Sequence, residues 1–116
     1  MLKIKRVYEP PAKEDGRRIL VERLWPRGLT KEKAKIDLWL KDIAPSPALR
    51  VWFGHDPAKW RVFRRRYAAE LKRRRALVHQ VRAKTEAGRV TFVYAARDAA
   101  HNSAVVLKEI VERQAT

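Results

Sequence analysis

One stretch, residues 90–107, constrains the fold more than any other part of the chain. It begins with an apolar run, 90–96, in which two side chains are aromatic and three are β-branched, as is typical of a buried strand. A polar loop, 97–101, follows this run. Asn102 or Ser103 can then cap a helix. The apolar face of that helix consists of Val105, Val106, Ile110 and Val111.

A strand that leads through a short loop into a helix is the unit from which α/β proteins are built. The loop lies at the carboxyl end of the strand, which is where such proteins bind their ligands. The first turn of the helix offers unpaired backbone N–H groups, which favour an anion. The stretch therefore predicts where binding or chemistry takes place, and it leaves the ligand open.

Other segments supply further strands. Residues 2–8 alternate apolar with basic side chains, which predicts a half-exposed strand, and residues 18–24 predict a more apolar, central strand. Residues 36–43 alternate like a third strand, although a helix is the alternative. Together with 90–96, we expect a small, mainly parallel sheet of three or four strands flanked by helices, in one α/β domain that spans residues 1–116.

Capping residues indicate where helices begin. Thr30 can cap a short helix at 31–35, and Ser46 followed by proline predicts a helix at 47–53. Asp56 followed by proline begins the longest helical region in the same way. The apolar stripe of that region consists of Trp60, Phe63, Tyr67 and Leu71.

Arg74 conflicts with one continuous helix. In the register of the apolar stripe, Arg74 would lie on the buried face. A charged side chain is costly at such a position. We therefore expect the long helical region to break within residues 72–76.

The charge of the chain indicates which chemical class of partner it favours. A total of 28 Lys and Arg against 13 Asp and Glu gives a net charge of +15. This excess favours nucleic acid, acidic lipid headgroups, or phosphorylated small molecules such as nucleotides, and a solvated basic surface is the alternative. There is no cysteine, which excludes disulfides, thiolate metal sites and cysteine nucleophiles. No apolar run is as long as a membrane span, so we expect a cytoplasmic protein without a membrane partner.

Four motifs, in order along the chain, resemble one known family. They are LVERLWPRGL at 20–29, APS at 44–46, WFGHDP at 52–57 and YAARDAAHN at 94–102. These residues are similar to the domain-of-unknown-function 488 family, in its small YeaO-like branch, over nearly the whole chain. The resemblance implies a compact α/β fold and leaves the biochemical activity open. In that family Glu22 stands where Asp is usual, and larger relatives carry a cysteine near the last strand where this chain has alanine.

Arginines are expected beside the ends of the two central strands. Two arginines lie at the end of the strand at 18–24 or just beyond it, and one follows the strand at 90–96, so neighbouring strands would bring them to one cleft. Guanidinium groups match the geometry of phosphate, and the predicted helix start adds N–H donors. The predicted anion-binding residues are Arg23, Arg27, Arg97 and Asn102. In the alternative, Glu22 or Asp98 pairs with these arginines and only braces the loops.

The loop after the last strand also holds the candidates for catalysis. His101 can act as a general acid or base, because its charge changes near neutral pH, and Asp98 can orient it. The alternative is a histidine that braces the loop, so the sequence leaves open whether the protein is an enzyme. Neither His–Asp pair has the spacing of a zinc site, and no glycine-rich phosphate loop is present. We therefore predict no metal and no cofactor.

A basic helix provides a second hypothesis. Arginine and lysine side chains of the long helical region would share a side and could follow a phosphate backbone without reading sequence. These residues are Arg61, Arg64, Arg65, Lys72 and Arg75. No helix-turn-helix or zinc-finger pattern accompanies them, and a solvated basic helix is the alternative.

Overall fold

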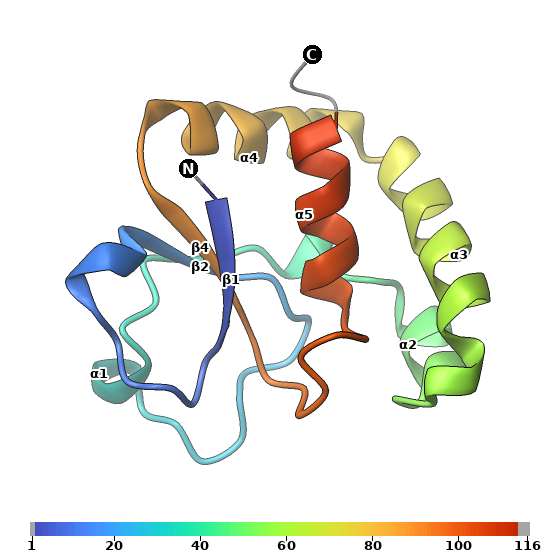
Figure 1. Cartoon of the computed structure of the whole chain (residues 1–116), viewed down its shortest axis with the longest axis horizontal. Helices are drawn as coiled ribbons and strands as arrows, with labels where there is room; N and C mark the ends of the chain where they lie inside the picture. The colour runs from blue at the N-terminus through green and yellow to red at the C-terminus, as the bar shows by residue number, and fades with distance from the viewer. Residues whose placement is uncertain (1, 114–116) are drawn as a thin grey trace.

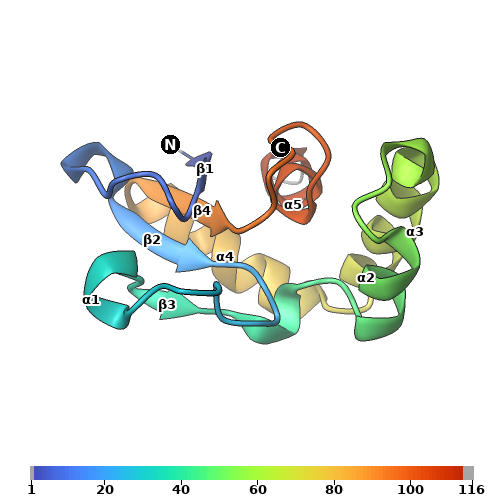
Figure 2. The ribbon, with the colours of Figure 1, turned by 90° about the horizontal axis from the view of Figure 1, so that it is seen from below.

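A four-stranded parallel sheet forms the centre of the computed structural model, which describes residues 2–113. The strands are β1 (Leu2–Arg6), β2 (Arg17–Leu20), β3 (Leu38–Trp39) and β4 (Val90–Tyr94). They lie in the order β1-β4-β2-β3, which can be followed in Figure 2. The register places Phe92 beside both Ile4 and Ile19. The predicted parallel sheet is confirmed, and β2 and β4 are neighbours within it.

The position of each strand in the sheet explains how deeply it is buried, and β3 differs in length from the prediction. β4 pairs on both sides, and all five of its residues are buried, as its apolar sequence predicts. β1 lies at one edge and is mostly half-buried, as expected for alternating basic residues. β3 is shorter than the predicted 36–43. The Asp37 carboxylate accepts the backbone N–H of Arg18 at 2.8 Å before β3 begins, and a 3-10 turn at Lys41–Ile43 follows it.

Five helices surround the sheet in the described part of the chain. They are α1 (Lys31–Ala34), α2 (Pro47–Phe53), α3 (Trp60–Lys72), α4 (Arg75–Ala87) and α5 (Ser103–Arg113). Figure 1 shows α3 and α5 side by side, with α4 across one end of both. The predicted caps of α1 and α2 are present, because the Thr30 hydroxyl accepts from Lys33 N and the Ser46 hydroxyl accepts from Leu49 N.

The long helical region differs from a single helix at both ends of α3. Asp56 caps a 3-10 turn, Pro57–Lys59, and α3 begins only after it. The predicted break is confirmed, because α3 ends at Lys72 and α4 begins at Arg75. The break frees Arg74 from the buried face, and its Nη1 donates a hydrogen bond to the Ala44 carbonyl at 2.6 Å.

The two faces of the sheet carry separate apolar cores. Alternate residues of β4 point to opposite faces, so Phe92 belongs to the larger core and Val93 to the smaller one. The larger core contains side chains of α3, α4 and α5. The smaller core packs Ala34 of α1 with the half-buried rings of Trp25 and Trp39. Both faces are therefore covered, and the ends of the strands are where side chains of several elements can meet.

No helix among the described residues is both long enough and apolar enough to cross a membrane.

Candidate anion-binding cleft

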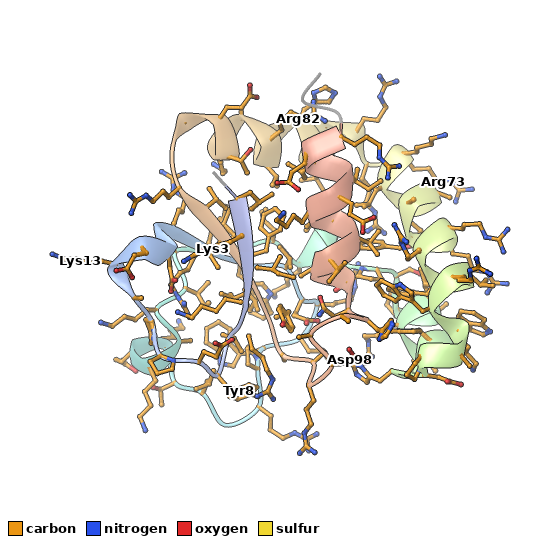
Figure 3. The ribbon with its side chains drawn as sticks, in the orientation of Figure 1. Lys3, Tyr8, Lys13, Arg73, Arg82 and Asp98 are labelled. Carbon is orange, nitrogen blue, oxygen red and sulfur yellow. The ribbon has the colours of Figure 1, made fainter. Side chains whose placement is uncertain are left out.

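A cleft of ≈ 710 Å³ lies beside the carboxyl ends of β2 and β4. Figure 1 shows that the loops after these two strands leave the same edge of the sheet, the lower edge in that view. Figure 3 shows Tyr8 and Asp98, which both line the cleft, at this edge. Its charged and amide side chains are Glu22, Arg23, Arg27, Arg50, His55, Arg97, Asp98 and Asn102. The structure thus brings all four predicted anion-binding residues to one place.

Arg23 braces the wall of the cleft. β2 ends at Leu20, so Arg23 lies in the loop that follows rather than in the predicted strand. Its Nε donates to the Pro45 carbonyl at 3.3 Å and its Nη2 donates to the Ala44 carbonyl at 3.2 Å. This side chain therefore holds the segment before α2 against the loop after β2. Only its Nη1 has no acceptor among residues 2–113.

Three other arginines of the cleft have uncommitted side chains. Arg27, Arg50 and Arg97 are exposed, and within the described residues none of their guanidinium groups has a hydrogen-bond or ion-pair partner. Neither Glu22 nor Asp98 forms an ion pair with Arg23, Arg27 or Arg97 in the described part of the chain, although the charge of Arg50 acts on Glu22. Sequence reasoning missed Arg50, whose only signal was its place in the last turn of α2.

Glu22 lies at the junction of the two central strands. Its Oε1 accepts the backbone N–H of Ala95 at 3.1 Å, where a strand carbonyl would otherwise do so. Burial raises the pKa of the Glu22 carboxyl above its usual range, although the Ala95 N–H and the nearby His55 and Arg50 oppose this. From the sequence, Glu22 was considered only as a partner of the arginines, and no pattern indicated its hydrogen bond with the Ala95 N–H.

The candidate catalytic pair braces its own loop. Asp98 Oδ1 accepts the N–H groups of Ala100 at 2.9 Å and of His101 at 3.0 Å, and its Oδ2 lies 2.8 Å from His101 Nδ1. The hydrogen bond with the His101 ring, with those from the backbone, lowers the pKa of Asp98. The imidazole contacts the Trp60 ring edge-on at 5.2 Å and does not line the cleft. This geometry matches the loop-bracing alternative.

Asn102 contributes through the backbone. Its Oδ1 accepts the Val105 N–H at 3.2 Å, which is the predicted cap of α5, and its Nδ2 donates to the Asp98 carbonyl at 2.9 Å. Because both ends of the side chain are engaged, the amide fixes the loop. Ser103, the first residue of α5, also lines the cleft, so the start of this helix faces it.

The basic residues of the second hypothesis belong to two helices and do not all line one groove. Arg61, Arg64 and Arg65 line an open groove of ≈ 570 Å³ between α3 and α5, in which Arg64 forms an ion pair with Glu109. Lys72 lies outside this groove, and Arg75 begins the next helix, because the chain breaks between them. The prediction of five residues on one side of one helix is wrong for Arg75.

No group of three or more acidic or histidine side chains is placed to hold a metal ion in the part of the chain that the structure describes.

Similarity to known proteins decides the family. The family described as the inactive DUF488-N3 subclade matches residues 1–116. The chain belongs to this family. Two uncharacterized proteins, one of Mycobacterium tuberculosis strain H37Rv and one of Mycobacterium bovis, are similar to this chain. Each is 39% identical to it over 110 residues, which is 95% of this chain and 92% of the relative. The uncharacterized protein YeaO of Escherichia coli K12 is 37% identical over 108 residues, or 93% of this chain and 94% of its own.

The likeness to YeaO and the subclade match confirm the family that the four motifs predicted. No solved structure matches this chain.

Proposed function

We propose that this protein binds a small phosphorylated molecule in the cleft at the ends of β2 and β4. The observation that carries the proposal is the group of three guanidinium side chains, those of Arg27, Arg50 and Arg97, which line one cleft without a hydrogen-bond or ion-pair partner among residues 2–113. Like charges repel one another, so an anion that binds between these side chains relieves their repulsion. Guanidinium groups bind phosphate through paired N–H donors.

Two further features support an anion in this cleft. The first turn of α5 faces the cleft, and its backbone N–H groups favour negative charge. The cleft also lies outside the carboxyl ends of parallel strands, where open α/β sheets bind their ligands.

Binding without turnover fits the description of the subclade as inactive. The pair formed by Asp98 and His101 is occupied in holding its loop, and the imidazole lies outside the cleft. We therefore assign the cleft to ligand binding and place no catalytic step in it.

The test is ligand-dependent thermal unfolding. Phosphate that binds only the folded chain stabilises it by about 2.7 kcal/mol at a hundredfold excess over its dissociation constant. The midpoint should rise in phosphate relative to chloride of matched ionic strength. The double variant Arg27→Ala, Arg97→Ala should lose this rise, because both side chains are exposed and neither forms a hydrogen bond or ion pair with another side chain of residues 2–113.

The matched control is Arg73→Ala, which removes an exposed basic side chain directly after α3. Figure 3 shows Arg73 far from Tyr8 and Asp98, which line the cleft. It should keep the response to phosphate. If the double variant responds like the parent protein, the cleft is not the anion site.

A second candidate function is sequence-independent binding of nucleic acid along α3. The observation that favours it is the groove between α3 and α5, whose wall presents Arg61 and Arg65 exposed and without ion-pair partners in the described chain. Phosphates of a nucleic-acid backbone would replace solvent around these side chains. The two functions use different surfaces, so variants of each surface separate them.

A further inference from the structure

Glu22 has one carboxylate oxygen to which no group of the described chain donates a hydrogen bond. Its Oε1 accepts the Ala95 N–H, and within residues 2–113 nothing donates to its Oε2. No buried side-chain nitrogen or oxygen of the described chain lacks a hydrogen-bond partner. The Oε2 atom is therefore not sealed in the core, and it opens into the cleft that Glu22 lines.

The Glu22 carboxylate would disfavour binding if the ligand of the cleft were phosphate alone. Its charge repels a phosphate, and its burial favours the neutral form. Both costs fall when a bound molecule offers an N–H donor to Oε2, because a buried charge is stabilised by hydrogen bonds. The ligand that suits this wall thus carries N–H groups at some distance from its phosphate.

The size and the apolar lining of the cleft indicate what lies between these two ends. A volume of ≈ 710 Å³ is within the range of about 300–1,000 Å³ that holds drug-sized ligands, and a single phosphate would leave most of it empty. Trp25 and Phe53 line the cleft. The Trp25 ring is fixed, because its Nε1 donates to the Leu29 carbonyl at 2.7 Å and its edge packs on Trp39 at 5.4 Å. A fixed aromatic ring suits a planar heterocycle.

We infer that the ligand of the cleft is a nucleoside phosphate. The phosphate binds at Arg27 and Arg97, the base lies in the apolar part of the cleft, and Glu22 accepts an N–H of the base. This inference rests on the proposed function, because it requires that the arginines bind phosphate. It goes beyond the proposed function by naming the class of ligand, a nucleoside phosphate, and by assigning Glu22 as a residue that determines specificity.

The experiment compares three probes by titration calorimetry at constant ionic strength: inorganic phosphate, ribose 5-phosphate and guanosine 5′-monophosphate. Guanine carries adjacent N–H donors, whereas ribose 5-phosphate has the same phosphate and sugar without a base. We expect the nucleotide to bind about tenfold more tightly than ribose 5-phosphate, since a hydrogen bond to a charged group contributes about that factor. This comparison needs no variant.

The variant Glu22→Gln then tests the carboxylate. It keeps an acceptor for the Ala95 N–H and removes the charge. We expect its affinity for the nucleotide to fall about tenfold, while its affinity for ribose 5-phosphate rises, because the repulsion is gone. The control Glu86→Gln makes the same change of charge at an exposed position of α4 and should leave the preference for the nucleotide unchanged.

The outcomes separate the inference from the proposed function. If the nucleotide binds no more tightly than ribose 5-phosphate, or Glu22→Gln strengthens the binding of both, the inference is wrong and the anion cleft stands. If none of the three probes binds the parent protein, the inference and the proposed function are both wrong.

Discussion

At the scale of single residues, Asp15 shows how this basic chain compensates a buried charge. The side chain is fully buried, and its carboxylate accepts hydrogen bonds from Lys5 at 3.2 Å, Arg18 Nη1 at 2.7 Å and the Ala12 N–H at 3.0 Å. Burial alone would raise the pKa of Asp15, but these hydrogen bonds, with that from Lys3, outweigh it and lower the pKa to about 2. The Asp15 carboxylate is therefore a structural centre that joins β1 to β2.

This network predicts a loss of stability in acid. The folded-state pKa of Asp15 is about 2, below the value of about 3.9 in an unfolded chain. A lowered pKa contributes stability above the unfolded value, and this contribution is lost as the pH falls from about 4 to about 2. Asp15→Asn should cost about 3–5 kcal/mol near neutral pH, because it removes the negative charge that pairs with the buried Arg18 guanidinium. Its free energy of unfolding should also vary less between pH 4 and pH 2 than that of the parent.

Urea unfolding across the pH range measures both effects. Asp42→Asn, an exposed carboxylate without a partner in the described chain, is the control and should behave like the parent. Equal pH dependence in the Asp15 variant and the parent would show that the buried carboxylate does not carry this contribution.

Glu22 should have the opposite dependence. Burial raises its pKa in the folded state, so its favourable contribution is complete below the unfolded pKa of about 4.3 and is lost as the pH rises through the folded value. Glu22→Gln should therefore gain stability relative to the parent as the pH rises to 7, and the difference between the two should shrink in acid. Chemical unfolding at pH 4 and pH 7 measures this, and a variant that is less stable only at pH 7 would contradict it.

At the scale of elements, the features that could be predicted from the sequence are those that contacts between nearby residues determine, such as helix caps. The caps at Thr30, Ser46 and Asn102 follow from bonds to the N–H three residues on, so a local pattern encodes them. The break after α3 was predictable from one residue, because Arg74 would lie on the buried face of a continuous helix. The sequence could not show that this side chain would reach the Ala44 carbonyl, or that Arg23 would donate to the same atom, because a long guanidinium can reach many acceptors.

The groove between α3 and α5 carries a prediction about nucleic acid. If it binds duplex DNA, the logarithm of affinity should fall linearly with the logarithm of salt, by about 0.9 for each phosphate contact. The double variant Arg61→Ala, Arg65→Ala should reduce this slope by about 1.8, and Arg27→Ala in the cleft should leave it unchanged. Measurement uses unrelated duplexes in a salt series.

A strong preference for one duplex, or an affinity that does not respond to salt, would count against α3 as a nucleic-acid surface. If only the Arg27 variant lost binding, the nucleic acid would bind at the cleft and not in the groove between α3 and α5.

At the scale of the whole molecule, the cleft exists only because three distant segments meet. Most of its lining comes from residues 22–27, 44–55 and 95–103, and Tyr8 and Phe63 complete it. The first and third were predictable, because both follow neighbouring parallel strands. The second was not, because α2 is placed by long-range contacts that no local pattern encodes, such as Phe53 stacked on Phe63 at 4.2 Å. The net charge of +15 acts on the molecule as a whole and favours any anion, so the site must be located residue by residue.

The most direct test of the anion cleft is a titration of the isotope-labelled protein with inorganic phosphate, followed by nuclear magnetic resonance of each backbone amide against a chloride series of equal ionic strength. We predict saturable shifts, absent with chloride, at the backbone amides of residues 23–25, of Arg27 and of residues 95–103. Residues 61–65 of α3 should change equally in both salts. Saturable shifts along α3, or none near the cleft, would contradict the proposal that these arginines bind phosphate.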